Sequence, residues 1–561
     1  MCGILGGNRH EWNYKAGIEC MEHRGPDGIK CCSLGNFTLA FARLAIMDLS
    51  ENGMQPMFSG DGKVGIVFNG EIYGFLELKE ELQKKGYIFK STSDTEVILN
   101  AYLEWGEKFI TKVDGMYGMA ILDKRDNTIK LFRDRMGIKP LYYFYNGKDF
   151  AFSSELKGIT TLCNNIEFEI DNTAIYDYLN YLYIPEPKTY YKNVYKLLPG
   201  HRLTFDINSK KIIKNSSYWR LDVNPYQGSQ RKREDIIDEL RTLVQESVRK
   251  QMIADVPVGT FLSGGVDSSI ITYESAQISP QVETFSIGFD EKRFDELKYA
   301  IQLAEKFNIR SNRKQFHKDV LNDSYQKLRN WYDEPFGDSS AFPTYFVSEF
   351  AKEKVTVVLT GDGGDEVFGG YPRYEVIQKG LFHDSLPKGL KVQINNVLDK
   401  AAYTRKMMYA RIRSTYAREM GDRDDIWRKR LGISKEYDKY WIIHKYYHAD
   451  LPPITRGQYL DIKTYLPGDI LTKVDRTAMA VSLETRVPFL DKRIVEFAFS
   501  LSEEDRCPGG DLKGILKSAY EKELGKKFLN RRKQGFSIPV RYFDRRSTQQ
   551  EEILKKAWEI E

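Results

Sequence analysis

At 561 residues the chain is too long for a single hydrophobic core, so two or three domains are expected. The 84 Lys and Arg residues exceed the 79 Asp and Glu residues by 84 − 79 = 5, and this small excess does not indicate a nucleic-acid or anionic-membrane partner. The sequence contains neither an apolar run of about 18 residues nor a signal peptide, so no membrane span is expected. Six cysteines without a C-x-x-C pair argue against a zinc ribbon or disulfide scaffold and favour a reducing, cytoplasmic location.

Short strands separated by Gly, Asn and Asp dominate residues 1–160. Two helices are expected among them, at Phe75–Lys85 and Thr95–Trp105. The sequence Ser93-Asp94-Thr95-Glu96 at the start of the second has the S-x-x-E spacing of a capping box. Strands that outnumber helices and connect closely predict an α+β N-terminal domain of stacked antiparallel sheets. The expected strands are Phe37–Ala42, Val64–Asn69, Gly118–Asp123, Ile129–Arg133 and Leu141–Tyr145.

The pattern changes after about residue 220. A polar stretch at 224–234 is interpreted as a linker. Beyond it, the apolar strands Val258–Leu262, Thr284–Ile287 and Val355–Thr360 alternate with helices, which predicts an α/β domain with a parallel sheet. From about residue 375 onward the sequence predicts a mostly helical C-terminal extension.

The N-terminal sequence Met1-Cys2-Gly3 suggests a nucleophile at Cys2. A small second residue permits removal of Met1, which would leave Cys2 with a free α-amine. The reference pKa is about 7.7–8.0 for such an amine and about 8.5 for a thiol, so one residue can supply both base and nucleophile. A cysteine at position 2 is by itself more often a buried small residue, and the functional interpretation therefore depends on motifs further along the chain.

Six further segments resemble the class II glutamine amidotransferases over about residues 1–210. The resemblance implies an Ntn-hydrolase-like sandwich at residues 1–215, in which the thiol attacks the glutamine side chain. It also implies that Arg43 binds the glutamine α-carboxylate, that Glu71 and Asp94 bind its α-ammonium, and that Asn69 and Gly70 form the oxyanion hole. Taken singly, these residues could be a surface cation, a first-turn acid and a hairpin turn. The matching segments are His23–Asp27, Arg43–Asp48, Asn69–Glu71, Ser93–Glu96, Arg133–Leu141 and Phe152–Glu155.

Two glycine-rich loops come after predicted strands of the second domain. Ser263–Ser269 lies between a strand and a helix, where backbone N–H groups and the helix N-terminus favour polyphosphate. No Walker G-x-x-x-x-G-K-[ST] sequence occurs. Asp267 would repel phosphate unless Mg²⁺ lay between them, and Gly361–Tyr371 supplies a second acidic loop. Either loop alone could be a tight turn with a solvated acid, but together they predict a crevice for Mg²⁺ and ATP.

The first loop looks like the PP-loop of ATP pyrophosphatases, and residues 1 to about 540 resemble the bacterial type of glutamine-hydrolysing asparagine synthetase. The resemblance places a synthetase domain at 232–545, with Mg²⁺ on Asp267 and Asp365. It implies that Glu334 is the general base on ammonia and that Lys533 neutralises the α-phosphate, although Lys533 could instead belong to a surface basic run. The implied ATP contacts are Leu262, Ser263, Gly264, Gly265, Asp267, Ser268, Ile287, Thr360 and Gly361.

The function implied by this resemblance is ATP-dependent amidation of aspartate with ammonia from glutamine, through β-aspartyl-AMP, with AMP and pyrophosphate as products. The substrates are small molecules, the cofactors are ATP and Mg²⁺, and a cytoplasmic homodimer is the family expectation. Another acceptor stays open, such as a sugar acid, a peptide carboxylate or an intramolecular ring closure; the intact Cys2 argues against the ring-closing β-lactam synthetases. A non-catalytic relative is another alternative, and the presence of Cys2, Asp267, Glu334 and Asp365 argues against it. A PP-loop enzyme of RNA thiolation is a weaker alternative, because the chain has no C-x-x-C pair and is nearly neutral.

Overall fold

The computed structural model describes residues 1–223, 231–291, 295–317, 327, 330–374, 427–448 and 450–531. Its N-terminal part contains two six-stranded antiparallel sheets. The strands of the first sheet, in order, are β10 (Val194–Lys196), β8 (Tyr142–Tyr145), β9 (Phe150–Ser153), β1 (Gly3–Gly7), β3 (Phe37–Arg43) and β2 (Gly28–Leu34). Those of the second are β12 (Lys211–Ser217), β11 (His201–Asp206), β7 (Thr128–Arg133), β6 (Asp114–Asp123), β5 (Val64–Tyr73) and β4 (Met57–Phe58).

The two sheets stack face to face and are covered by helices on their outer faces. Ile4 and Phe41 of the first sheet pack with Val67 and Leu131 of the second in one buried apolar cluster. The helices α1 (Tyr14–Glu19) and α4 (Leu156–Leu162) cover the first sheet, and α2 (Phe75–Lys84) and α3 (Asp94–Trp105) cover the second. The result is a four-layer sandwich, which confirms the α+β prediction.

The second part is built on a five-stranded parallel sheet, which confirms the α/β prediction. Its strands, in order, are β15 (Arg310–Phe316), β14 (Glu283–Phe289), β13 (Val258–Phe261), β16 (Val357–Leu359) and β17 (Glu484–Arg486). Apolar clusters pack α6 (Arg233–Gln251) and α7 (Val266–Ile278) against the sheet, and a separate cluster packs α10 (Ala341–Lys352) against it. The edge β17 comes from far along the chain and was not predicted, because three residues are too few to show an alternating pattern.

The C-terminal extension was predicted to be mostly helical, and where the structure describes it, it is helical apart from the strand β17 and the connecting segments. Among the described residues, the helices lack the combination of length and apolarity that a membrane crossing requires. The remaining helices are α5 (Asn172–Tyr181), α8 (Leu297–Lys306), α11 (Gly364–Phe368), α16 (Trp441–Tyr446), α17 (Pro453–Lys463), α18 (Thr472–Met479), α19 (Lys492–Ser500), α20 (Glu503–Arg506), α21 (Gly514–Ala519), α22 (Glu521–Leu524) and α23 (Lys526–Leu529).

Two local predictions need correction. The Ser93 hydroxyl caps α3 by accepting from the Thr95 N–H, but the Glu96 carboxylate does not complete a capping box; it accepts from the N–H groups of Lys90 and Ser91, because the preceding loop folds back over the helix start. The expected linker ended at residue 234, whereas α6 already begins at Arg233. Residues 224–230 of that stretch lie outside the described residues.

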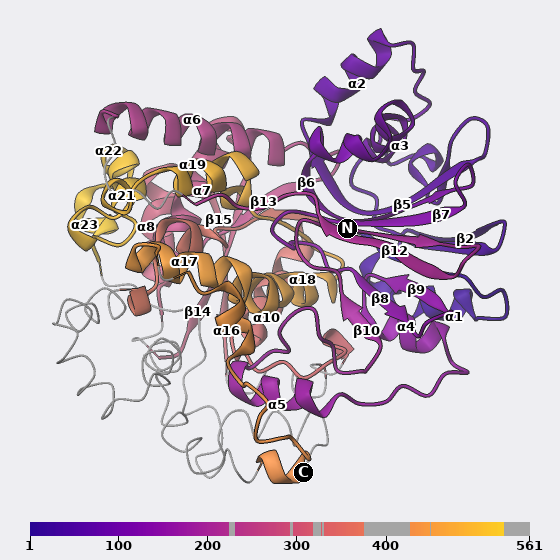
Figure 1. Cartoon of the computed structure of the whole chain (residues 1–561). Coiled ribbons are helices and arrows are strands. Elements are labelled where there is room, and N and C mark those ends of the chain that lie inside the picture. Colours follow the sequence, from indigo (N-terminus) through magenta and orange to yellow (C-terminus); the bar gives the residue numbers. More distant parts are fainter. Residues whose placement is uncertain are drawn as a thin grey trace.

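A buried ion cluster joins the two parts. Arg24 is 0% exposed and pairs with Asp475 on α18 and with Glu155, which precedes α4, each at 2.8 Å. Arg476 on α18 pairs with the same Glu155 at 2.9 Å. Charges buried this deeply are costly to leave unpaired, so the cluster holds the two parts in one arrangement. In Figure 1 the N-terminus lies at this junction, between the antiparallel sheets on the right and the helix-covered parallel sheet on the left.

Candidate functional site

Cys2 lies directly before β1, where the pairing of Gly3 with Ala42 brings it next to the end of β3. Its backbone N–H donates to Oδ1 of Asn69 at 3.0 Å, and its thiol contacts the carbonyl oxygen of Leu44 at 3.8 Å. The Arg24 guanidinium donates to the Cys2 carbonyl oxygen at 3.3 Å. Burial raises the pKa of the Cys2 thiol, and the N-terminal ammonium offsets only part of this shift. The thiol therefore needs a nearby base before it can act as a nucleophile.

The predicted glutamine-binding residues meet around this thiol. Cys2, Arg43, Gly70, Glu71 and Asp94 all line one cavity at the junction of the two parts. Met1 also lines it and is only 2% exposed. The cavity measures about 40 Å³ with Met1 in place, which is room for a few water molecules and not for an amino acid.

Asn69 and Gly70 are adjacent on β5, beside the thiol. Asn69 is 0% exposed, and its Nδ2 has no hydrogen-bond partner, while its Oδ1 is held by the Cys2 N–H. An orphaned buried amide donor costs free energy and is best explained by a ligand atom that it stabilises. A Cβ at Gly70 would lie 2.0 Å from the Met116 carbonyl oxygen, so only glycine lets β5 approach β6 this closely. The role of Asn69 and Gly70 as an oxyanion hole stays a prediction, and the unpartnered Asn69 Nδ2 is a donor that such a hole requires.

Charged groups surround the rest of the cavity. The Arg43 guanidinium, 5% exposed, donates to the carbonyl oxygens of Ser50 (2.7 Å) and Asp48, which fixes its orientation. Burial raises the pKa of Asp94 to about 6, although its carboxylate accepts from the Ile72 N–H at 2.9 Å. Burial and the neighbouring Asp94 also raise the pKa of Glu71. Carboxylates of this kind gain from a cationic ligand such as an α-ammonium.

Two residues of β17 were not predicted from sequence: Glu484 lines the cavity, and Arg486 pairs with residues of its wall. Glu484 accepts from the Met1 ammonium at 2.9 Å, and Arg486 pairs with Glu484 at 2.7 Å and with Glu71 at 3.1 Å. Burial opposes the charge on Glu484, but the N-terminal ammonium and Arg486 outweigh it and lower its pKa to about 2. An acid and a base two residues apart in a strand share one face, and this Glu-x-Arg spacing was the available signal.

The first glycine-rich loop has the conformation expected for a phosphate site. Ser263 Oγ accepts from the Gly265 N–H at 3.1 Å and contacts Ser268 Oγ at 3.0 Å, and α7 begins at Val266. Gly264 has φ +83°, a conformation that favours glycine, and a Cβ there would make a tight contact of 3.0 Å with the Ala300 nitrogen. Leu262 is buried between the end of β13 and this loop. Ile287 is buried on β14, where the neighbouring Ser286 hydroxyl donates to the Leu262 carbonyl oxygen.

The second loop packs directly on the first. A Cβ at Gly361 would lie 2.6 Å from the Ser268 nitrogen, and one at Gly364 would lie 2.6 Å from Asp267 Oδ1. Thr360 directly follows β16 and donates its N–H to the Arg486 carbonyl oxygen at 2.9 Å. The predicted nucleotide-binding residues on the two loops are thus brought together.

Asp267 and Asp365 fit a Mg²⁺ site that relies on substrate oxygens. Both carboxylates contact the ammonium of Lys513, so they lie close together. Within the described residues no group of three or more His, Cys, Asp or Glu side chains is arranged to hold a metal alone. Mg²⁺ is usually bound by one or two carboxylates plus substrate phosphates, and two acidic loops provide such a donor set.

The contacts of Glu334 are with the N-terminal part of the chain. Glu334 is 8% exposed and pairs with Lys196, and it accepts from the Tyr190 N–H at 3.2 Å. Burial raises the pKa of Glu334 despite the Lys196 ammonium. Its role as general base stays a prediction. Lys533 lies outside the described residues.

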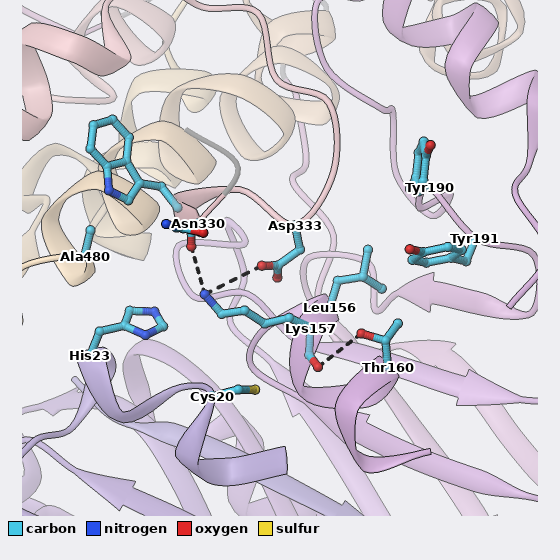
Figure 2. Close-up of a pocket in the computed structure, with 11 residues that line it drawn as sticks. Cys20, His23, Leu156, Lys157, Thr160, Tyr190, Tyr191, Asn330, Asp333 and Ala480 are labelled. Carbon is cyan, nitrogen blue, oxygen red and sulfur yellow. Dashed lines mark hydrogen bonds and ion pairs between the residues drawn. The ribbon is translucent and has the colours of Figure 1, made fainter. Parts of the chain in front are cut away.

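A larger cavity of about 540 Å³ lies on the other side of the buried ion cluster (Figure 2). Figure 2 shows Lys157 reaching across it to the Asn330 carbonyl oxygen (2.9 Å) and to Asp333 (3.8 Å). Lys157 also pairs with Glu155 at 2.9 Å. This cavity contains none of the predicted catalytic residues.

Comparisons with known proteins show the family to which the chain belongs. A family model described as asparagine synthase matches residues 239–557, and a glutamine amidotransferase domain model matches residues 1–219. The chain is 35% identical over 97% of its length to asparagine synthetase [glutamine-hydrolyzing] 1 of Bacillus subtilis, covering 88% of that protein. It is 40% identical over 67% of its length to putative asparagine synthetase [glutamine-hydrolyzing] 2 of Methanocaldococcus jannaschii, covering 75% of it. Among solved structures, glutamine phosphoribosylpyrophosphate amidotransferase from B. subtilis aligns with 64% of this chain and 81% of its own, at 14% identity and a TM-score of 0.31. The chain belongs to the asparagine synthase family.

Proposed function

We propose that this protein makes asparagine from aspartate, ATP and ammonia that it releases from glutamine, with a glutaminase domain at residues 1–215 and a synthetase domain at 232–545. One observation supports the coupling most directly. Arg486 pairs through its side chain with Glu71 in the proposed glutamine pocket, and its carbonyl oxygen accepts from Thr360 in the proposed ATP loop. Arg486 therefore contacts both the proposed glutamine site and the proposed ATP site. This supports a transfer of ammonia from the first site to the second within the protein.

The glutaminase step begins with removal of Met1. The cavity beside Cys2 is too small for glutamine while Met1 lies in it, and removal would also expose the Cys2 α-amine. That amine takes the thiol proton, and the thiolate attacks the side-chain amide carbon of glutamine. Asn69 Nδ2 and the Gly70 N–H stabilise the oxyanion, and the proton returns to the leaving ammonia. Water then hydrolyses the thioester to glutamate.

The synthetase step uses the two loops. The aspartate β-carboxylate attacks the α-phosphorus of ATP, so pyrophosphate leaves and β-aspartyl-AMP forms. Ammonia that arrives through the protein interior attacks the acyl carbon, Glu334 accepts a proton, and AMP leaves as asparagine forms. Bound on Asp267 and Asp365, Mg²⁺ would neutralise phosphate charge. The loop glycines and serines hold the phosphates, and Lys533 is proposed to neutralise the α-phosphate.

The substrate test is pyrophosphate release from ATP with candidate carboxylates. We expect aspartate to trigger release, with AMP and asparagine formed in equal amounts when glutamine is present. Release with a sugar acid and none with aspartate would replace aspartate as the acceptor while leaving the two-site chemistry in place.

A further inference from the structure

Lys513 places its ammonium between the two carboxylates proposed to bind Mg²⁺. Lys513 is 6% exposed and lies directly before α21. Its Nζ contacts Asp365 Oδ1 at 2.5 Å and also Oδ2 of Asp267. The two carboxylates come from different loops, so this side chain bridges the crevice. Sequence reasoning assigned Lys513 no role.

The backbone around Lys513 is built for this contact. Lys513 has φ +59°, a left-handed conformation that a residue with a Cβ adopts at some cost. Its N–H donates to the Phe368 carbonyl oxygen at 3.1 Å, which ties it to the end of the second loop. A Cβ at Gly370 would lie 1.9 Å from Asp365 Oδ1 and 2.1 Å from Lys513 Cε. A left-handed lysine beside an obligatory glycine indicates that the position of the ammonium matters.

A divalent cation and the Lys513 ammonium need the same carboxylate oxygens. The positive charge of the Lys513 ammonium weakens the attraction of Asp267 and Asp365 for a metal ion. The phosphates of a nucleotide reverse this balance, because they bring negative charge that can pair with the ammonium and oxygens that complete the metal's coordination.

We propose that Lys513 makes this a site that takes a divalent cation only together with a nucleoside triphosphate. Lys513 competes with free metal for Asp267 and Asp365, and polyphosphate oxygens draw the ammonium away as the metal enters with them. The inference rests on the ATP site of the proposed function and adds the order of binding: metal and nucleotide arrive together. Lys513 thus acts as an internal counter-ion that is exchanged for the substrate complex.

The test uses Mn²⁺ as the metal probe, detected by electron paramagnetic resonance on the full chain, with and without α,β-methylene-ATP. For the wild type we expect no tight site for Mn²⁺ alone and at least about tenfold tighter Mn²⁺ binding with the analogue. K513Q removes the charge at similar length, and we expect it to bind Mn²⁺ alone at least about tenfold more tightly than the wild type. K517Q is the matched control, since Lys517 lies on the same α21 but pairs with Asp511 at 2.6 Å, and it should behave as the wild type.

Tight Mn²⁺ binding by the wild type without nucleotide would overturn the role of Lys513, even if K513Q does not fold. Unchanged binding of free Mn²⁺ by a folded K513Q would overturn it as well. In both cases the ATP site itself would stand if the analogue still binds. A wild type that binds neither the analogue nor its Mn²⁺ complex would instead refute the ATP site of the proposed function, and the Lys513 inference with it.

Discussion

The oxyanion hole offers the sharpest test of the glutaminase site. The substitution N69A removes the Asn69 Nδ2, which has no hydrogen-bond partner of its own to lose, together with the Oδ1 that accepts from the Cys2 N–H at 3.0 Å. Removing one such donor typically costs about 2.7–4 kcal/mol of transition-state stabilisation, or about 10²–10³ in kcat. KM for glutamine should change little, because the oxyanion forms only in the transition state.

The assay is glutamate release at saturating glutamine, with asparagine synthesis from ammonium chloride measured in parallel. We expect the rate of glutamate release to fall by about a hundredfold or more. The rate of asparagine synthesis from ammonium chloride should be retained. N180A is the matched control: Asn180 is also a buried amide, but its Nδ2 donates to the Tyr176 carbonyl oxygen at 2.7 Å within α5. A glutaminase kcat of N69A within about tenfold of the wild type would refute the assignment of Asn69.

Three further perturbations test the contacts of the site. R43K removes the forked guanidinium of Arg43, which two carbonyl oxygens hold in place. KM for glutamine should therefore rise about tenfold or more, with a smaller change in kcat. An unchanged KM would contradict the proposal that Arg43 binds the glutamine carboxylate. Burial raises the pKa of Asp94 to about 6, so its carboxylate loses its charge as the pH falls below that value, and KM for glutamine should rise. D94N should raise KM throughout and weaken this dependence, leaving the part that belongs to Glu71, whose pKa is also raised; an unchanged pH dependence of KM would contradict the role of Asp94. R24M leaves the buried Glu155 and Asp475 without a shared cation and should destabilise the protein by about 3–5 kcal/mol, measured as a lower Tm. R9M is the control: the Arg9 side chain is 33% exposed and pairs with Asp149, so its loss should cost less, about 1 kcal/mol. Equal Tm values for R24M and R9M would contradict the structural role of the cluster.

The layers of the fold were predictable because each element has a strong local pattern. The run Val64–Asn69 is a short, mostly apolar segment next to Gly and Asp residues, and β5 contains it entirely. The helix after Ser93 was predicted to within a residue of α3, because its N-cap and apolar spacing agree. The parallel sheet was predicted from apolar runs that alternate with helices, and β13, β14 and β16 lie within or around those runs.

The features that could not be predicted depend on contacts between distant segments. Glu484 and Arg486 lie more than 400 positions from Glu71, and nothing local in Glu-Thr-Arg says which cavity a short edge strand will face. The bridge from Lys513 to the two loops has the same origin, since a lysine near glycines is typical of an exposed turn. The motif residues around Cys2 were found because their order along the chain resembles a known family, and that order says nothing about the Met1 side chain inside the same cavity.

The most direct test of the central claim traces nitrogen from [¹⁵N-amide]glutamine into asparagine by mass spectrometry. With ATP, Mg²⁺ and aspartate, the wild type should give ¹⁵N-labelled asparagine, and the substitution C2A should give none while still making asparagine from ammonium chloride. Asparagine that stays unlabelled with the wild type, or label that still enters it with C2A, would contradict the account of an N-terminal thiol that feeds an adenylating site.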